Sequence, residues 1–340
     1  MKIAILSRPD FRSPRILSDS LQLHLEQQGV EIEIFYRIGL LNRMVSFNDS
    51  KLSFHFWIKR KLKHFLEDAR LLKRLKQFDA VIISECIPNG FLKRIYNVEK
   101  FKGIIKKPVG IYEVYYLGNA PTQIEFLQKN KEQLLDRFDF HLSIASVTEI
   151  KQTTSKNWFP IGIKTESWNL KPLSKKEIVA IIDFAFPGNE LVRQSQINAL
   201  KNCGIKYISL ERSFTIEEIR QIYQQGSIYF MQSYEAFGLP VLECLLAGCQ
   251  VFAAKSWWPM SWRLNENPEI HSAGILPECF TVYDGEEELK NKLLAFKESY
   301  DFESTPEKVF DNFLNHYPEF YYGNEVEVQR LITYLKDQIN

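Results

Sequence analysis

One stretch of this chain, residues 228–254, constrains the fold more than any other. It opens with an apolar run, residues 228–231, that is typical of a buried strand, and it closes with a second run at residues 250–254. Between them, Pro240 suits the first turn of a helix, because its fixed φ is helical and its missing N–H would lack a helical partner there. Gly248 is typical of a left-handed helix C-cap. A strand, a helix and a strand in this close succession predict a βαβ unit and an α/β fold.

The polar residues that follow the first of these strands would lie where open α/β sheets bind ligands, at the carboxyl ends of the strands. The predicted helix begins at about Leu239, and Gly238 before it lets another group approach the backbone closely. Such a helix N-terminus is suited to a phosphate or a diphosphate. Glu235 and Glu243 flank this position and are suited to accepting hydrogen bonds from hydroxyl groups. Together these groups fit a nucleotide sugar, whereas either glutamate alone could be an ordinary solvated acid near a helix end.

The string Glu-Ala-Phe-Gly-Leu-Pro-Val-Leu-Glu, at residues 235–243, resembles the donor-site signature of the group 1 retaining glycosyltransferases of the GT-B fold. Both glutamates stand at the family spacing, and the Phe-Gly-Leu-Pro core is intact. In that family the first glutamate contacts donor-sugar hydroxyls, the second contacts the nucleotide ribose, and the backbone amides between them touch the sugar and the diphosphate. The resemblance therefore implies a catalytic role for Glu235 and a ribose contact for Glu243. It implies further donor contacts for Phe237, Gly238, Leu239 and Pro240.

A length of 340 residues predicts two domains, and an apolar content of 45% suffices for two cores. The order of predicted strands and helices fits two doubly wound, Rossmann-like domains that face a central cleft, as the resemblance implies. We expect an acceptor-side domain at residues 1–165 and a nucleotide-sugar-binding domain at residues 166–318. Residues 319–340 are expected to form a C-terminal helix that crosses back to the first domain.

The first domain departs from the family pattern at two places. The loop of residues 8–15 has no glycine where relatives usually have a glycine-rich turn. Its arginines could meet a phosphate or an acidic acceptor, or they could be ordinary surface residues; they are Arg8, Arg12 and Arg15. Near the end of the predicted strand at residues 108–114, many relatives have a histidine that faces the reacting sugar. This chain has none there, and Glu113, with Tyr115 and Tyr116 beside it, is our candidate catalytic group.

The second domain also departs from the pattern. Relatives commonly carry an arginine and a lysine just after its first strand, where they neutralise the diphosphate, but residues 183–189 of this chain read Asp-Phe-Ala-Phe-Pro-Gly-Asn. Arg193, one turn into the next predicted helix, is our first substitute for a diphosphate contact, and Arg212 is the second. Each could equally be structural. Residues 255–262 hold three tryptophans that could stack on sugar faces or fill the seam between the domains.

The resemblance implies a retaining glycosyl transfer in which protein groups hold the diphosphate leaving group and stabilise the charge that develops on it. The acceptor, a glycan, a glycolipid or another cell-surface polysaccharide precursor, would attack from the same face. The nucleotide sugar is then a substrate, so no cofactor is expected, and no Asp-X-Asp cluster indicates a metal. One alternative is a degenerate GT-B protein that binds a nucleotide sugar or a partner without turnover. A GT-B epimerase is a weaker one.

The charge balance and the cysteines exclude several other classes of protein. Lys plus Arg at 43 against Asp plus Glu at 42 argues against general binding to nucleic acid. Five cysteines without a CxxC pair indicate neither a disulfide framework nor a zinc site, so a reducing cytosol is the simplest setting. The sequence shows no signal-peptide pattern and no apolar run long enough to span a bilayer.

Residues 54–78 combine apolar positions at helical spacing with many lysines and arginines. The interpretation that we favour is a helix whose apolar stripe covers the sheet of the first domain. The alternative is a helix that lies on an anionic membrane surface, which would place a cytoplasmic protein at the inner membrane face.

Overall fold

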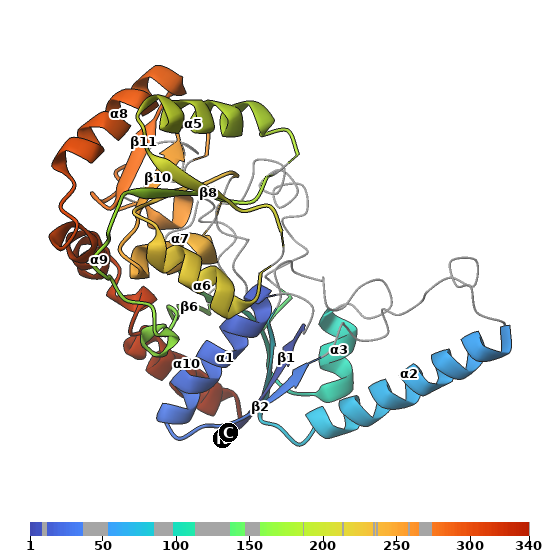
Figure 1. Cartoon of the computed structure of the whole chain (residues 1–340). Helices are drawn as coiled ribbons and strands as arrows, with labels where there is room; N and C mark the ends of the chain where they lie inside the picture. The colour runs from blue at the N-terminus through green and yellow to red at the C-terminus, as the bar shows by residue number, and fades with distance from the viewer. Residues whose placement is uncertain are drawn as a thin grey trace.

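The structure is a computed structural model of the 340-residue chain (Figure 1). It describes residues 1–8, 12–36, 54–84, 98–112, 137–146, 157–185, 187–212, 214–233, 235, 237–257, 259–264 and 274–339. Within these ranges the chain forms two parallel β-sheets, each covered by helices. The predicted doubly wound α/β fold is therefore confirmed.

The first sheet has the strand order β2-β1-β3-β4-β5-β6. Its strands are β1 (Lys2–Ser7), β2 (Glu31–Tyr36), β3 (Ala80–Ser84), β4 (Val109–Tyr112), β5 (Phe140–Ser143) and β6 (Trp158–Pro160). Successive side chains of a strand point to opposite faces of its sheet. In β1, Ile3 and Ile5 belong to one buried cluster and Ala4 and Leu6 to another. Both faces of this sheet are therefore apolar and require a helical cover.

Helices cover both faces of the first sheet. On one face lie α1 (Arg12–Gln27) and the last helix of the chain, α10 (Glu325–Ile339). On the other face lie α3 (Val98–Ile105) and the end of α2 (Phe54–Leu75). The sheet is thus enclosed between two helical layers, as expected for parallel strands that are apolar on both sides.

The first half of α2 does not cover the sheet. We expected the apolar stripe of residues 54–78 to pack on the first domain, and this holds only for its end, where Leu71 and Leu75 are buried. Leu62 and Phe65 each expose 57% of their surface. Figure 1 shows the reason, because the first turns of α2 project beyond the body of the domain. Our favoured interpretation of this segment is therefore wrong for its first half.

The second sheet has the strand order β11-β10-β9-β7-β8. Its strands are β7 (Val179–Ile182), β8 (Lys206–Ser209), β9 (Ile228–Phe230), β10 (Gln250–Ala254) and β11 (Phe280–Tyr283). The helices around it are α5 (Glu190–Asn202), α6 (Ile216–Gln225), α7 (Leu239–Leu246), α8 (Gly285–Ser299) and α9 (Ser304–His316). The helix predicted to begin at about Leu239 and the strand predicted at residues 250–254 are both present.

Each sheet has a topological switch point beside its first strand. β1 lies between β2 and β3, and β7 lies between β8 and β9. Ligands of open α/β sheets bind outside the carboxyl ends of the strands at such a point. In the first sheet, Ser7 Oγ and Ser84 Oγ each donate to Pro14 O over 3.0 Å, so the first turn of α1 is tied to the ends of β1 and β3.

The chain passes between the two domains twice, and the two crossings lie side by side. The N–H of Ile163 donates to Glu319 O over 2.9 Å, and the N–H of Thr165 donates to Tyr321 O over 2.9 Å. Gly162 borders this pairing with a φ of 69°, and a Cβ added there would lie 2.2 Å from Glu319 O. Only glycine therefore allows the two crossings to approach this closely.

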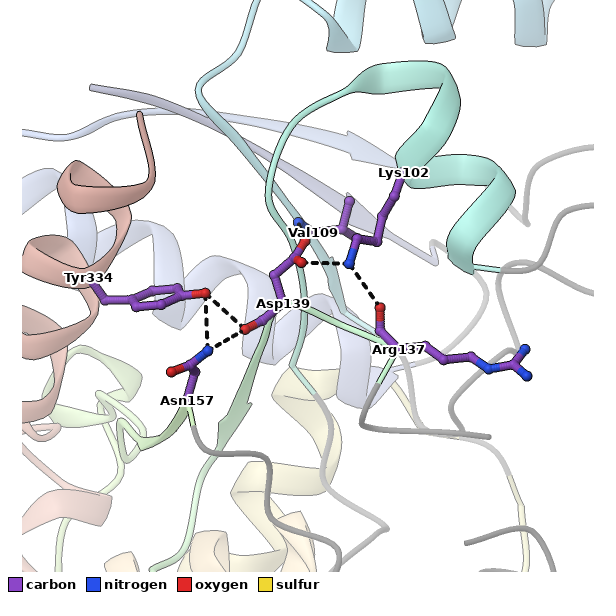
Figure 2. A network of polar contacts seen from close by, with 6 residues as sticks. All are labelled: Lys102, Val109, Arg137, Asp139, Asn157 and Tyr334. Carbon is purple, nitrogen blue, oxygen red and sulfur yellow. Dashed lines mark hydrogen bonds and ion pairs between the residues drawn. The ribbon is translucent and has the colours of Figure 1, made fainter. Parts of the chain in front are cut away.

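Helix α10 is joined to the first sheet by hydrogen bonds around Asp139, which precedes β5 (Figure 2). The hydroxyl of Tyr334 on α10 donates to Asp139 O over 2.9 Å, and Asn157 Nδ2 donates to the same oxygen over 2.8 Å. The Asp139 carboxylate accepts from the N–H of Val109 (2.8 Å) and from Lys102 Nζ. The last helix of the chain is thus held against the edge of the N-terminal sheet.

Candidate functional site

The N-terminus of α7 follows the loop that leaves β9. Gly238 is its N-cap residue, with a φ of 72°, and Pro240 stands in its first turn. A Cβ added at Gly238 would lie 2.9 Å from Val241 Cγ2 and 3.3 Å from Glu235 Cβ, so a larger residue would be both strained and crowded. No side chain of the described residues caps this helix. Its first-turn N–H groups are therefore aligned without a side-chain acceptor, which suits an anion.

Glu235 and Asp183 lie at the switch point between β7 and β9. Asp183 follows β7 directly, and Glu235 lies in the loop after β9. Burial, together with the negative charge of Asp183, raises the pKa of Glu235 to about 8, and a hydrogen bond from Ser233 Oγ (3.4 Å) opposes this shift. Glu235 is therefore protonated at neutral pH. Its carboxyl group can then donate a hydrogen bond to a sugar hydroxyl as well as accept one.

Glu243 has no exposed side-chain surface and forms an ion pair with a residue of α6. Its Oε1 lies 3.0 Å from Nε of Arg220. The Arg220 guanidinium in turn lies over the ring of Trp168, with its central carbon 4.7 Å from the ring centroid. Trp168 belongs to the short helix η3 (Glu166–Trp168), which precedes β7. Glu243 on α7 thus contacts Arg220 on α6, which in turn contacts the segment between the two sheets. This is a structural role, whereas the sequence predicted a ribose contact for Glu243.

Arg193 and Arg212 occupy different positions relative to the switch point. The guanidinium of Arg193 donates to Asp183 O and to Ser209 Oγ, so it lies across the carboxyl ends of β7 and β8. Arg212 is exposed, pairs with Glu218 on α6 at 3.5 Å, and lies over the ring of Phe214 at 4.3 Å. Of the two predicted diphosphate contacts, Arg193 is therefore the one held at the strand ends.

A buried polar network holds the loop after β9, and the sequence did not single it out. Gln232 Nε2 donates to Gln196 Oε1, and Gln196 Nε2 donates to the hydroxyl of Tyr283 over 2.6 Å. Asn189, the N-cap residue of α5, donates from its side chain to Gln232 O. These bonds connect α5 and β11 to Gln232, which follows β9 and precedes Glu235 in the chain. Buried side-chain amides require such partners, but their positions become known only once the strands are assembled.

An aromatic cluster packs on Phe237, just before the N-terminus of α7. The ring of Trp262 stacks on that of Phe237 with centroids 5.1 Å apart, and Trp262 Nε1 donates to Phe237 O over 2.6 Å. Phe320, from the second crossing, meets both rings edge-on, at 4.8 Å from Phe237 and 5.1 Å from Trp262. Trp262 is therefore buried among aromatic rings of the second domain and of the second crossing, and it does not face a sugar. Because the side chains of Phe237 and Leu239 are buried as well, their contacts with a ligand would come from the backbone.

Several candidates lie outside the described residues. These are Glu113, Tyr115, Tyr116 and Trp258, together with the side chain of Arg12, whose backbone begins α1. Arg15 is exposed, with its Nε 4.0 Å from Asp19 on the same helix. Arg8 lies directly after β1. The predictions for the acceptor side therefore stay predictions.

The described part of the chain has neither a cluster of metal-ligating side chains nor a membrane-spanning helix. In these ranges, no group of three or more histidine, cysteine, aspartate or glutamate side chains is placed to hold a metal ion. None of the helices in the same ranges combines the length and the apolar character that crossing a bilayer requires.

Comparison with known proteins identifies the architecture. No protein-family profile matches the chain, and no curated protein matches it in sequence. Among solved structures, the chain is similar to HepE of Anabaena in complex with UDP-glucose, with 13% identity over 99% of this chain and 100% of that one and a TM-score of 0.53. It is also similar to the catalytic domain of starch synthase IV of Arabidopsis thaliana bound to ADP and acarbose, with 12% identity over 98% and 99% and a TM-score of 0.54.

A third similar structure is that of a protein described with a different activity. It is described as a UDP-N-acetylglucosamine 2-epimerase of Listeria monocytogenes, and the match has 11% identity over 99% of this chain and 96% of that one, with a TM-score of 0.55. At these identities the similarity defines the fold. The chain has the GT-B fold over almost its whole length, a fold shared by proteins that act on nucleotide sugars in more than one way.

Proposed function

We propose that the protein is a glycosyltransferase that moves a sugar from a nucleotide-diphosphate sugar to an acceptor with retention of configuration and without a metal. The observation that carries this proposal is the pairing of Glu235 with the glycine-led N-terminus of α7 at the switch point of the second sheet. Two proteins of the same fold, HepE and starch synthase IV, have structures that contain UDP-glucose and ADP, respectively. In the proposal, residues 166–318 hold the donor and residues 1–165 hold the acceptor, a glycan or a lipid-linked glycan.

The proposed chemistry rests on holding the leaving diphosphate. The first-turn N–H groups of α7 would bind it, and the fixed guanidinium of Arg193 would add positive charge at the same strand ends. Because these donors are positioned before the bond breaks, they would stabilise the charge that develops on the diphosphate. Glu235 would hold a hydroxyl of the departing sugar. A neutral Glu235 is compatible with a diphosphate nearby, whereas a second charged carboxylate beside Asp183 would repel it.

A second candidate is a GT-B protein that binds a nucleotide sugar without turnover. Two observations favour it. Asp183 stands where relatives carry the basic pair that neutralises the diphosphate, and the carboxylate of Glu243 is engaged by Arg220. Both candidates predict binding, so turnover is the property that distinguishes them.

The experiment is to measure the release of nucleoside diphosphate from a panel of nucleotide sugars. The native chain is compared with Glu235→Ala and with Glu298→Gln, which replaces an exposed acid on α8. We expect one donor to be turned over by the native chain and by Glu298→Gln. Loss of a hydrogen bond to the transition state should lower the rate of Glu235→Ala by about a hundredfold or more.

Thermal-shift measurements with nucleoside diphosphates and their sugars accompany the assay, because a ligand that binds only the folded state raises the melting temperature. Binding of a nucleotide sugar without release of nucleoside diphosphate from any donor would favour the non-catalytic candidate. If no nucleotide raised the melting temperature of the native chain, both candidates would be wrong.

A further inference from the structure

The exposed half of α2 presents large apolar side chains on one face. Ile58, Leu62, Phe65 and Leu66 expose 44%, 57%, 57% and 47% of their surface. Their spacing of i, i+4, i+7 and i+8 puts them on one side of the helix. Single exposed apolar residues are ordinary on a protein surface, whereas a contiguous group of them marks an interaction site.

The same half of the helix is strongly basic. Residues 54–66 contain four lysines and arginines and no aspartate or glutamate, in a chain whose net charge is only +1. Lys59 and Lys63 are exposed and lie beside the apolar face. The described contact of Lys63 is with Glu67, at 4.0 Å on the open surface, and such a pair is weak. The positive charge is therefore concentrated on this segment and is available to an anionic surface.

The body of the protein holds only the other half of α2. Leu71 and Leu75 are buried against α3 and the first sheet, and Arg74 pairs with Glu33 of β2 at 2.6 Å. These contacts fix the helix axis while its first turns extend outward (Figure 1). The apolar face is thus presented on a rigid helix that the fold does not need for its own core.

We propose that the first half of α2 docks the protein on an anionic lipid bilayer. The apolar face would enter the boundary between headgroups and acyl chains, and the lysines beside it would contact acidic headgroups. A second copy of this chain is a poorer partner, because facing helices would bring eight like charges together. The proposal does not depend on the sugar-transfer activity, since it concerns the surface of α2 and not the candidate donor site.

The test is flotation of the full-length protein with vesicles of phosphatidylcholine alone and of phosphatidylcholine mixed with phosphatidylglycerol. We expect binding to the anionic vesicles that weakens as salt is added, and much weaker binding to the neutral ones. Lys59→Gln with Lys63→Gln should reduce partitioning by about twenty-five-fold, or roughly fivefold for each lysine. Leu62→Ser with Phe65→Ser should reduce it by about tenfold or more.

The matched controls are Leu191→Ser, at an exposed leucine on α5, and Lys336→Gln, at an exposed lysine on α10, and both should bind as the native chain does. All of these variants should melt at the native temperature, because their side chains lie on the surface. Equal binding to both kinds of vesicle, or native binding by both double variants, would overturn the proposal. So would a native dimer that Leu62→Ser with Phe65→Ser converts to a monomer, since the apolar face would then be a protein interface.

Discussion

Glu235 owes its chemical state to its neighbours. A solvated glutamate is charged at neutral pH, but here burial and the charge of Asp183 raise the pKa of the carboxyl to about 8. The sequence supplies the residue, whereas its protonation depends on burial and on the position of Asp183 after β7. A neutral carboxyl beside the proposed diphosphate site would avoid the repulsion that two charged acids would cause.

The raised pKa of Glu235 makes stability depend on pH. Between about pH 4.5 and 8 the folded chain retains a proton that the unfolded chain releases, so stability falls as pH rises through this window. Glu235→Gln cannot ionise at this position. We therefore expect the unfolding free energy of this variant, minus that of the native chain, to be larger at pH ~9 than at pH ~5, by on the order of 2 kcal/mol. Urea unfolding at the two pH values measures this. A stability difference that is the same at both pH values would show that Glu235 has an ordinary pKa.

The N-terminus of α7 is the element on which the proposed site depends. Its N-cap residue, Gly238, has a positive φ, and a Cβ added there would crowd Val241 and Glu235. The indole N–H of Trp262 donates a hydrogen bond to the carbonyl of Phe237, the residue before Gly238. The helix tip is therefore fixed before any ligand arrives, as a preorganised anion site requires.

Gly238→Ala tests this element. The left-handed φ costs an alanine about 1 kcal/mol, and the 2.9 Å approach to Val241 Cγ2 adds to that cost, so we expect a loss of about 2 kcal/mol in unfolding free energy. The variant should also bind nucleoside diphosphate more weakly, because the first turn of α7 must shift. Gly285→Ala is the control, since Gly285 has a φ of 82° with nothing within 4 Å of an added Cβ. If both variants lost the same stability, the crowding at Gly238 would be unimportant.

At the scale of the whole molecule, the two domains share a buried apolar cluster in addition to the two chain segments that connect them. One buried cluster contains side chains of both sheets, for example Ile5 of β1 and Ile181 of β7. The two crossings are hydrogen-bonded to each other, and the rings of Trp262 and Phe237 pack on Phe320 of the second crossing. We therefore expect the domains to unfold together, because neither completes its apolar cover alone.

Trp262→Ala tests the aromatic cluster that packs on the second crossing. Removal of a fully buried indole leaves a cavity and an unpaired carbonyl at Phe237, so the free energy of unfolding should fall by about 3–5 kcal/mol. Trp168→Ala is the comparison, because that ring is partly exposed and mainly covers Arg220, and its loss should cost about 1 kcal/mol. Calorimetry should show one transition for the native chain. A cost for Trp262→Ala no larger than that for Trp168→Ala would mean that this aromatic cluster contributes little to stability.

The sequence was informative wherever the physical signal is local. Pro240 and Gly248 delimited α7, and apolar runs indicated the strands, because backbone conformation depends on near neighbours. The amphipathic pattern of residues 54–78 correctly indicated a helix but could not say what its apolar face would meet. Nothing in the pattern distinguishes a stripe that covers a sheet from one that remains exposed, as that of α2 does at Leu62 and Phe65.

The sequence by itself therefore determined the α/β class, the succession of elements in the second domain, and the glycine and the two glutamates around α7. Only the tertiary structure decided that burial and the charge of Asp183 raise the pKa of Glu235, that Arg220 binds Glu243, and that Trp262 packs on Phe237. The reason is physical. Local conformation follows from neighbouring residues, whereas a pKa, an ion pair or a buried ring depends on atoms that are distant in the chain and adjacent only after folding.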